Sequence, residues 1–362
     1  MKTGSPNRRD LLVGTLAIAG ASLGSRALAQ RMEAVPTFAA ASTEAILAQA
    51  GTLPAMRTLI VSLAGKRQIE RVLRGPPADQ PVNVKSVSKT IIAALTGIAI
   101  ERKVFSGLDQ PIAPLLASKL PDNPDPRLHR VTIGHLLSMQ SGLGRTSGPN
   151  YGRWVSSRDW VRYALAQEFI GEPGGEMLYS TGNSHILSAL LTQETGRSTL
   201  AIARDWLGKP LDISIPPWPR DPQGIYFGGN DMLLSPRAMC VFGELFLNGG
   251  AASGGGGQVI PKGWIEKSWQ PRTRSPYTGD AYGLGWFITA GPDGRPIHYA
   301  WGYGGQMIYV VPHASLVVAI TSDTGAPSAR SGYVRQLHGL VSDLILPAAT
   351  AALPPDGGKS PA

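Results

Sequence analysis

Segments that favour β-strands stand at both ends of this 362-residue chain, and helical segments fill its middle. Near the N-terminus, the runs LIVSL and QIERVL flank a turn at Ala64-Gly65-Lys66, which predicts a hairpin. Toward the C-terminus, Gly and Pro separate four short β-rich runs: YGLGWFI, PIHYAW, QMIYVV and LVVAITS. We therefore predict an α/β (α+β) fold, with one antiparallel sheet built from both chain ends, flanked by helices, and an inserted helical region.

The composition is that of a globular protein with a large core. Hydrophobic residues make up 43% of the chain and charged residues 16%, which suits one large domain or two closely joined subdomains. The formal net charge is +9, but the Lys and Arg residues are scattered and form no basic helix. This pattern favours a solvated basic surface over a nucleic-acid site. The single cysteine, Cys240, lies in an apolar run, so we expect it in the core and not as a nucleophile.

Residues 1–29 have the features of an export signal. A basic start precedes an apolar stretch, and Ala27-Leu28-Ala29 forms an A-x-A cleavage site before Gln30. The pair Arg8-Arg9 resembles the twin-arginine signal, which carries folded proteins. We expect a bacterial protein that is periplasmic or secreted after cleavage. An uncleaved anchor is the competing interpretation, although the apolar stretch is too short for a normal membrane span.

The predicted elements fall within residues 30–345, which we expect to form the domain, and residues 346–362 are predicted to be a disordered tail. The predicted helices include TEAILAQA, the run after Ser86, SRDWVRYALAQ, SHILSALLTQETG, a helix that begins at Ser235-Pro236, and GYVRQLHGLVSDLIL.

Ser86 and Lys89 stand at the start of an apolar run of helical length. Side chains three residues apart share one face of a helix, so the lysine amine can approach the serine hydroxyl. The helix N-terminus adds unpaired N–H groups and the positive end of a dipole. A serine can become nucleophilic in this way without histidine. The four-residue pattern alone also fits an N-cap serine followed by a surface lysine.

A second serine pattern has no such support. Gly20-Ala21-Ser22-Leu23-Gly24 matches the G-x-S-x-G nucleophile elbow, but it lies in the export signal with no strand before it. The mature chain contains no other match, so we reject this serine as a nucleophile.

Several segments, in this order, resemble the β-lactamase-related serine hydrolases. This group includes class C β-lactamases, D-alanyl-D-alanine carboxypeptidases, related esterases and 6-aminohexanoate-dimer hydrolase. The segments lie within residues 43–345, and their joint order and spacing are far more specific than Ser-x-x-Lys. They are SVSKTIIAALTGIAIERKVFSGLDQPI, VTIGHLLSMQSGL, EPGGEMLYSTGN, GGNDMLLSPRAMCVFGELFLNGG, YGLGWFI and WGYGGQMIYVVP. The resemblance implies a β-lactamase/transpeptidase-like fold.

The resemblance also implies roles for three side chains. Ser86 would be the nucleophile that forms an acyl-enzyme, and Lys89 would take its proton. Tyr179 matches the tyrosine of the Tyr-x-Asn element and would share proton transfer with the lysine. A desolvated lysine has a lowered pKa and can act as a base, which makes these roles physically sound. For Tyr179 the alternative is a loop aromatic residue that only packs its ring.

The resemblance places an oxyanion hole between the backbone N–H of Ser86 and a strand edge near Trp301-Gly302-Tyr303-Gly304. Two preorganised donors would stabilise a tetrahedral oxyanion there. The glycines would let the backbone approach a substrate closely.

Two motifs depart from the β-lactamase pattern. The second motif reads Tyr-Ser-Thr, so Thr181 stands where an asparagine is expected, and Asn183 is two residues out of place. The third motif reads Trp301-Gly302-Tyr303 instead of Lys-Thr-Gly and lacks the carboxylate-binding lysine. Both differences weaken the case for β-lactam hydrolysis and are compatible with an esterase or amide hydrolase, and GYGGQ looks closest to the 6-aminohexanoate-dimer hydrolase relatives. His298 could supply a polar contact, but a structural histidine is favoured.

The sequence thus predicts an exported serine hydrolase that cleaves a small-molecule ester, amide or peptide. The alternatives are a β-lactamase or D-alanyl-D-alanine carboxypeptidase, and a non-catalytic penicillin-recognising binding protein. A metal-dependent β-lactamase is disfavoured, because the six histidines show no H-x-H or H-E-x-x-H spacing. No cofactor, metal or nucleic-acid partner is expected.

Overall fold

The computed structural model describes residues 36–325 and 331–354, so the predicted export signal lies outside the described part of the chain. Its main sheet has eight strands in the order β2-β1-β10-β9-β8-β7-β6-β5. The strands are β1 (Met56–Leu63), β2 (Lys66–Val72), β5 (Thr273–Arg274), β6 (Ala281–Tyr282), β7 (Phe287–Ala290), β8 (Pro296–Gly302), β9 (Gln306–Val311) and β10 (Leu316–Ser322). Two short strands, β3 (Val82–Asn83) and β4 (Leu233–Leu234), pair separately.

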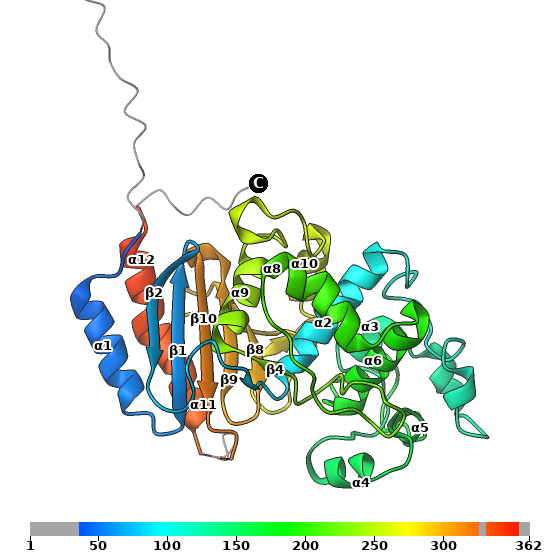
Figure 1. Cartoon of the computed structure of the whole chain (residues 1–362). Coiled ribbons are helices and arrows are strands. Elements are labelled where there is room, and N and C mark those ends of the chain that lie inside the picture. The colour runs from blue at the N-terminus through cyan, green and yellow to red at the C-terminus, as the bar shows by residue number, and fades with distance from the viewer. Residues whose placement is uncertain (1–35, 326–330, 355–362) are drawn as a thin grey trace, which may run out of the picture. The chain divides into compact units, whose positions relative to one another are not determined.

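Both ends of the chain contribute to this sheet, as predicted. Strand β1 pairs antiparallel with β2 on one side and with β10 on the other, with Leu59 opposite Ile320. Figure 1 shows the blue N-terminal strands beside the orange C-terminal strands. The predicted hairpin is confirmed. Its turn places Ala64 and Gly65 at positive φ, which glycine adopts without strain.

Helices cover the sheet and fill the inserted region (Figure 1). They are α1 (Ala40–Gly51), α2 (Val87–Glu101), α3 (Ile133–Leu137), α4 (Tyr151–Val155), α5 (Trp160–Leu165), α6 (Thr181–Thr195), α7 (Thr199–Ala203), α8 (Lys209–Leu211), α9 (Pro236–Leu247), α10 (Lys262–Trp269), α11 (Tyr333–Gly339) and α12 (Leu346–Ala352), with π-helical turns at Arg204–Gly208 and Leu340–Ile345. The predicted helix start at Ser235 is confirmed, because its hydroxyl accepts a hydrogen bond from the N–H of Ala238.

The sheet is buried on both faces. Along β10, Val317 and Ala319 belong to the core beneath α2 and α9, whereas Val318 and Ile320 belong to the core beneath α1 and the C-terminal helices. Successive side chains of a strand point to opposite faces, so a strand covered on both sides is apolar throughout. This explains the unbroken apolar run in LVVAITS.

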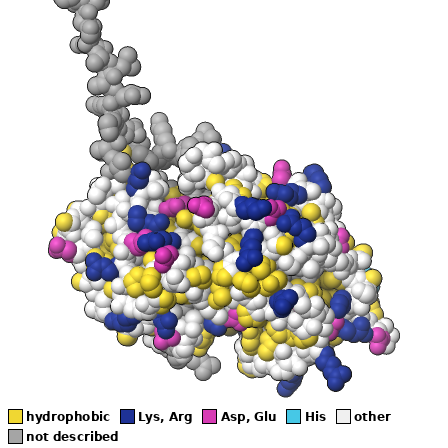
Figure 2. All heavy atoms as spheres, in the orientation of Figure 1, with side chains coloured by type: hydrophobic (Ala, Val, Ile, Leu, Met, Phe, Trp, Pro, Cys, Tyr) yellow, Lys and Arg dark blue, Asp and Glu magenta, His cyan; other side chains and the backbone are white. Residues whose placement is uncertain are grey.

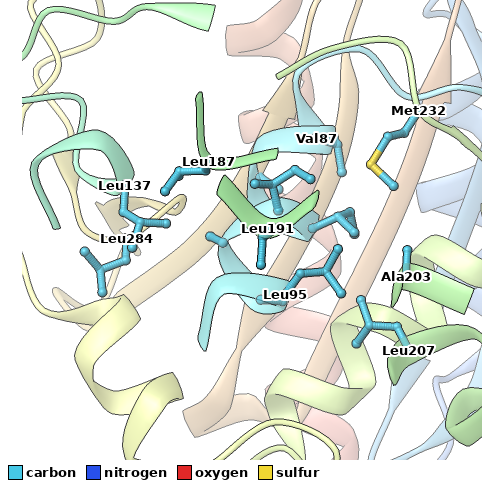
Figure 3. Packing of buried hydrophobic residues seen from close by; sticks show 14 of the residues in the cluster. Val87, Leu95, Leu137, Leu187, Leu191, Ala203, Leu207, Met232 and Leu284 are labelled. Atoms are coloured by element: carbon cyan, nitrogen blue, oxygen red, sulfur yellow. The ribbon is translucent and has the colours of Figure 1, made fainter. Parts of the chain in front are cut away.

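Helix α2 is the central element of the inserted region. Every residue from Val87 to Ala99 is buried, so the helix has no solvent-facing side. Figure 3 shows its apolar side chains surrounded by others from α3, α6 and neighbouring segments. Burial on all sides sets the position of its N-terminus, where Ser86 stands.

The predicted tail begins too early. Residues 346–352 form α12, in which Leu346, Ala348 and Ala349 are buried. Pro347 follows a π-helical turn and lies in the first turn of α12, where its missing N–H costs little. The prediction of disorder is therefore wrong for residues 346–352, in which alanine combines a high helix propensity with close packing. Residues 355–362 lie outside the described part of the chain.

Two further expectations concern burial and membranes. Cys240 is buried on α9, as predicted, and burial raises the pKa of its thiol. Within residues 36–325 and 331–354, no helix is both long and apolar enough to cross a membrane. On the face in Figure 2, Lys and Arg side chains are spread out and interspersed with Asp and Glu.

We predict that Gly97→Ala destabilises the protein. A Cβ at Gly97 would lie 2.3 Å from the buried indole ring of Trp264 on α10. The cost of overpacking, about 1–3 kcal/mol, should exceed the roughly 1 kcal/mol that alanine gains over glycine in a helix. Urea unfolding should show a lower midpoint. Gly51→Ala is the matched control, because a Cβ there meets nothing within 4 Å; equal midpoints for the two variants would contradict the packing argument.

Candidate active site

Ser86 is the residue immediately before α2, and it is partly exposed. The chain reaches it through Lys85, which has a φ of 51°, an uncommon and strained conformation for a lysine. The Ser86 hydroxyl makes no capping hydrogen bond to the helix. Ser86 therefore occupies the N-cap position, but its side chain does not cap the helix.

The Lys89 side chain is buried, with 3% of its surface exposed, and it is not a surface lysine. Its Nζ lies 2.9 Å from Ser86 Oγ, 2.6 Å from the carbonyl oxygen of Gly229 and 3.4 Å from Thr181 Oγ1. Burial lowers the pKa of Lys89 to about 7, against the opposing effect of Asp231. A substantial fraction of the amine is thus neutral near pH 7 and able to accept the serine proton.

Tyr179 lies just before Ser180, the N-cap of α6. Its ring centroid is 4.9 Å from Lys89 Nζ, and the nearby Ser86 hydroxyl lowers the pKa of its phenol, against the larger effect of burial. The ring also stacks on Phe287, with centroids 6.2 Å apart. Burial raises the pKa of Tyr179 to about 12, so the phenol keeps its proton at neutral pH. The structure therefore brings Ser86, Lys89 and Tyr179 together, with a lysine suited to accept a proton and a tyrosine suited to donate one.

Thr181 is the first residue of α6, three residues earlier than the predicted start of this helix. Its hydroxyl lies between Lys89 and Ser147, whose Oγ is 2.8 Å away. Asn183, two residues further along α6, is buried, and its Oδ1 accepts a hydrogen bond from the Ser141 hydroxyl. The threonine thus contacts the lysine amine, whereas the displaced asparagine contacts Ser141.

The end of β8 packs directly on the turn that precedes Ser86. A Cβ at Gly302 would lie 2.3 Å from the carbonyl oxygen of Val84 and 3.1 Å from Lys85 Cβ, so only glycine permits this approach. Tyr303 and Gly304 form the turn into β9, with Tyr303 exposed and Gly304 at positive φ. Gly302 thus packs against the turn that leads to Ser86, and the role of this strand end in an oxyanion hole stays a prediction.

The Trp301 side chain packs in the core on the opposite face of the sheet from α2. Its ring centroid is 5.8 Å from that of Phe287, the residue on which Tyr179 stacks. Trp301 therefore packs on Phe287, which in turn supports the ring of Tyr179. It also places an apolar side chain where the third motif of β-lactamases has a charged one.

Sequence reasoning missed Asp231. This residue has a φ of 61°, and its Oδ1 accepts hydrogen bonds from Lys85 Nζ at 2.9 Å and Asn83 Nδ2 at 2.8 Å. Asp231 forms an ion pair with Lys85, and its charge raises the pKa of Lys89 by less than burial lowers it. The segment GGNDMLLSP belonged to the resemblance, but no motif assigned its residues a role.

The carbonyl of Gly229 was missed as well. A Cβ at Gly229 would lie 2.6 Å from the Thr181 carbonyl oxygen, and a Cβ at Gly228 would lie 2.1 Å from that of Ser184. Two glycines are thus needed for this loop to lie against α6 and to bring a carbonyl to Lys89. A fully buried hydrogen bond joins His185 Nε2 and Asp221 Oδ2 at 3.0 Å.

His298 is buried on β8 and stacks on Trp269, with ring centroids 4.0 Å apart. Burial lowers the pKa of this imidazole to about 3, so it is neutral at ordinary pH. This is a structural environment, as the sequence favoured. In the part of the chain that the structure describes, no group of three or more His, Cys, Asp or Glu residues could hold a metal ion.

Comparisons with known proteins show the family of this chain. A model of the Beta-lactamase family matches residues 58–341. The chain is 24% identical over 298 residues to 6-aminohexanoate-dimer hydrolase from Paenarthrobacter ureafaciens, covering 72% of this chain and 69% of that protein.

Solved structures share the fold. A D-stereospecific amidohydrolase from Streptomyces sp. has a TM-score of 0.61 at 19% identity, over 78% of this chain and 93% of its own. EstCE1, a hydrolase with promiscuous acyltransferase activity, has a TM-score of 0.68 at 17% identity, over 84% and 98%.

We predict that the desolvation of Lys89 is visible in stability. A lysine pKa lowered to about 7 means that folding displaces a proton at any pH between about 7 and the unfolded value near 10.5. The resulting cost is largest below pH 7 and disappears as pH rises toward 10. The unfolding free energy of Lys89→Met relative to wild type should therefore fall by about 1–3 kcal/mol between pH 6.5 and 9.5. Urea unfolding at both pH values tests this, and a pH-independent difference would contradict it.

Proposed function

Because the chain belongs to the Beta-lactamase family, we propose that it is an exported serine hydrolase that cleaves an ester or amide through an acyl-enzyme on Ser86. Family membership confirms the resemblance inferred from the motifs, and with it the β-lactamase-like fold and the assignment to the β-lactamase-related hydrolases. The observation that carries the proposed mechanism is the 2.9 Å contact between Lys89 Nζ and Ser86 Oγ in a desolvated site.

Acylation would begin with the neutral amine of Lys89. The amine takes the hydroxyl proton as Ser86 Oγ bonds to the substrate carbonyl carbon, and the carbonyl oxygen becomes an oxyanion. The backbone N–H of Ser86 and a donor from the β8 end, near Tyr303 and Gly304, would stabilise this charge. The packing of Gly302 on the turn before Ser86 supports this placement.

Tyr179 would complete acylation. Its phenol gives a proton to the leaving alcohol or amine as the carbonyl–leaving-group bond breaks, and it regains a proton from the Lys89 ammonium. Water then attacks the acyl-enzyme, with the same two side chains acting as base and acid. The contacts of Tyr179 with both Ser86 and Lys89 support this relay.

Two observations support a proposal for the substrate class: the third motif has no lysine, and the relatives include hydrolases with substrates other than β-lactams. The chain has Trp301 where a β-lactamase has the carboxylate-binding lysine, and its relatives include an amide hydrolase and an esterase-type hydrolase. We propose a small-molecule ester or amide substrate. A β-lactamase or D-alanyl-D-alanine carboxypeptidase is the second candidate, which the family favours. The contacts among Ser86, Lys89 and Tyr179 favour either enzyme over a non-catalytic binding protein.

We propose the bacterial periplasm or the exterior as the place of action. The support is the basic start, Arg8-Arg9 and the A-x-A cleavage site of residues 1–29.

Covalent labelling tests the nucleophile. Wild type should gain one adduct mass with a fluorophosphonate, because the activated Ser86 hydroxyl attacks phosphorus, and Ser86→Ala should gain none. Intact-mass spectrometry reads both. Ser156→Ala, which removes an exposed serine at the end of α4, is the control and should label like wild type. A folded wild type without an adduct would reject the enzyme. In a separate experiment, formation of a Ser86-dependent adduct with a β-lactam would favour the β-lactamase or carboxypeptidase candidate.

The pH dependence tests the base. With a neutral ester, kcat/KM should rise about tenfold per unit up to pH 7 and level off above it, because only the neutral Lys89 amine accepts the proton. Tyr179→Phe should lower kcat/KM by about 10²-fold or more and leave the midpoint near 7, because the phenol is neutral throughout this range. If the midpoint of the kcat/KM profile shifts away from 7 in Tyr179→Phe, the titrating group is instead the tyrosine.

A further inference from the structure

A cavity of about 690 Å³ lies along the segment 144–150, and its lining includes Arg145, Ser147, Glu168 and Ile170. This volume suits a small organic ligand. The cavity adjoins the candidate active site, because Ser147, one of its lining residues, places its hydroxyl 2.8 Å from Thr181 Oγ1, which in turn contacts Lys89.

Three consecutive hydrogen bonds hold the cavity wall against the active-site segment. Arg145 Nε donates to the carbonyl oxygen of Tyr179 at 3.1 Å, and Thr146 N–H donates to Ser180 Oγ at 3.1 Å. The N–H of Thr181 donates to Ser147 Oγ at 2.8 Å. Arg145, which lines the cavity, therefore lies directly beside the segment that carries Tyr179.

Arg145 is the cationic residue of this wall. One of its N–H groups is used by Tyr179, and its guanidinium lies over the ring of Tyr277 at 5.3 Å. Among the described residues, no carboxylate forms an ion pair with Arg145. Glu168 lines the same cavity but makes no ion pair with it. The partly buried guanidinium thus retains N–H donors suited to bidentate binding of a carboxylate.

Apolar side chains accompany this charge. In the described part of the chain, the exposed large hydrophobic residues are Val72, Ile170, Tyr277 and Tyr303. Ile170 lines the cavity, and the guanidinium of Arg145 lies over the ring of Tyr277. Two of these four exposed apolar residues thus accompany Arg145, as expected of a surface that binds a partly apolar ligand.

We propose that Arg145 binds a carboxylate of the substrate, so that the enzyme acts on esters or amides of anionic compounds with an apolar body. This inference rests on the proposed hydrolase function. Arg145 is a specificity-determining residue on the loop 144–150, and the negative charge of Glu168 in the same cavity opposes its attraction for the carboxylate.

Matched ester pairs test the proposal. Mono-4-nitrophenyl glutarate and 4-nitrophenyl pentanoate differ in a carboxylate on the acyl side, and 4-acetoxybenzoate and its methyl ester differ on the leaving side. Wild type should prefer the anionic member of one pair by about tenfold or more in kcat/KM, and that pair identifies the side which enters the cavity. Arg145→Gln should remove the preference, mainly through KM, by about 10–100-fold, whereas the neutral ester should change less than about threefold.

Three variants sharpen this result. Arg145→Lys should keep part of the preference, because it keeps the charge but loses bidentate geometry. Glu168→Gln should increase the preference. Arg153→Gln, at an exposed arginine of α4 that does not line the cavity, should leave it unchanged. A wild type without any preference would overturn the proposal, and so would an equal loss on both esters in Arg145→Gln, which would assign Arg145 only to holding Tyr179.

A binding measurement separates this inference from the proposed function. Saturation-transfer NMR with pentanoate and pentanamide should show Arg145-dependent binding of pentanoate in both wild type and Ser86→Ala. Retained binding without any esterase turnover would reject the hydrolase and keep the anion site. Ser86-dependent turnover without pentanoate binding or an anionic preference would reject the anion site and keep the hydrolase.

Discussion

The burial of one amine, that of Lys89, is the constraint on which the site depends. A lysine amine removed from water needs hydrogen-bond acceptors for its N–H groups, and its desolvation must be strong enough to favour the neutral form. The structure meets the first need with Ser86, Gly229 and Thr181. It meets the second by burying α2 on every side. A helix with no exposed face is held in place by packing on all of its sides. The apolar side chains of α3, α6 and the neighbouring loops together provide this packing for α2 (Figure 3).

Backbone strain and close approaches gather around the same amine. Lys85 and Asp231 both have positive φ, and their side chains form the ion pair beside Ser86. Gly302 and Gly229 bring two separate backbones within distances that no Cβ would allow. Conformations of this kind persist only where the surrounding structure holds them, and they are commonly found at functional sites. Here they bring the β8 end and the loop before β4 to the N-terminus of α2.

The active-site contacts continue into the cavity beside them. The segment Tyr179–Thr181 contacts Ser86 and Lys89 through two of its side chains and the segment 145–147 through hydrogen bonds. Chemistry and substrate selection therefore share one short stretch of chain. A change in the cavity wall can alter the position of the phenol, which is why neutral and anionic substrates must be compared in the same variant.

The sequence by itself determined the local features: the β1–β2 hairpin, the strands from both ends, and the i, i+3 spacing that brings Lys89 to Ser86, because turn chemistry and helical periodicity act over a few residues. The family resemblance added Tyr179, whose motif is recognisable although 90 residues distant. Only the tertiary structure decided that Gly229, Asp231 and Arg145 join the site, since backbone carbonyls have no sequence signature and long-range contacts depend on packing. It also decided that residues 346–352 are helical, because their small apolar side chains gain stability only when a sheet face is there to bury them.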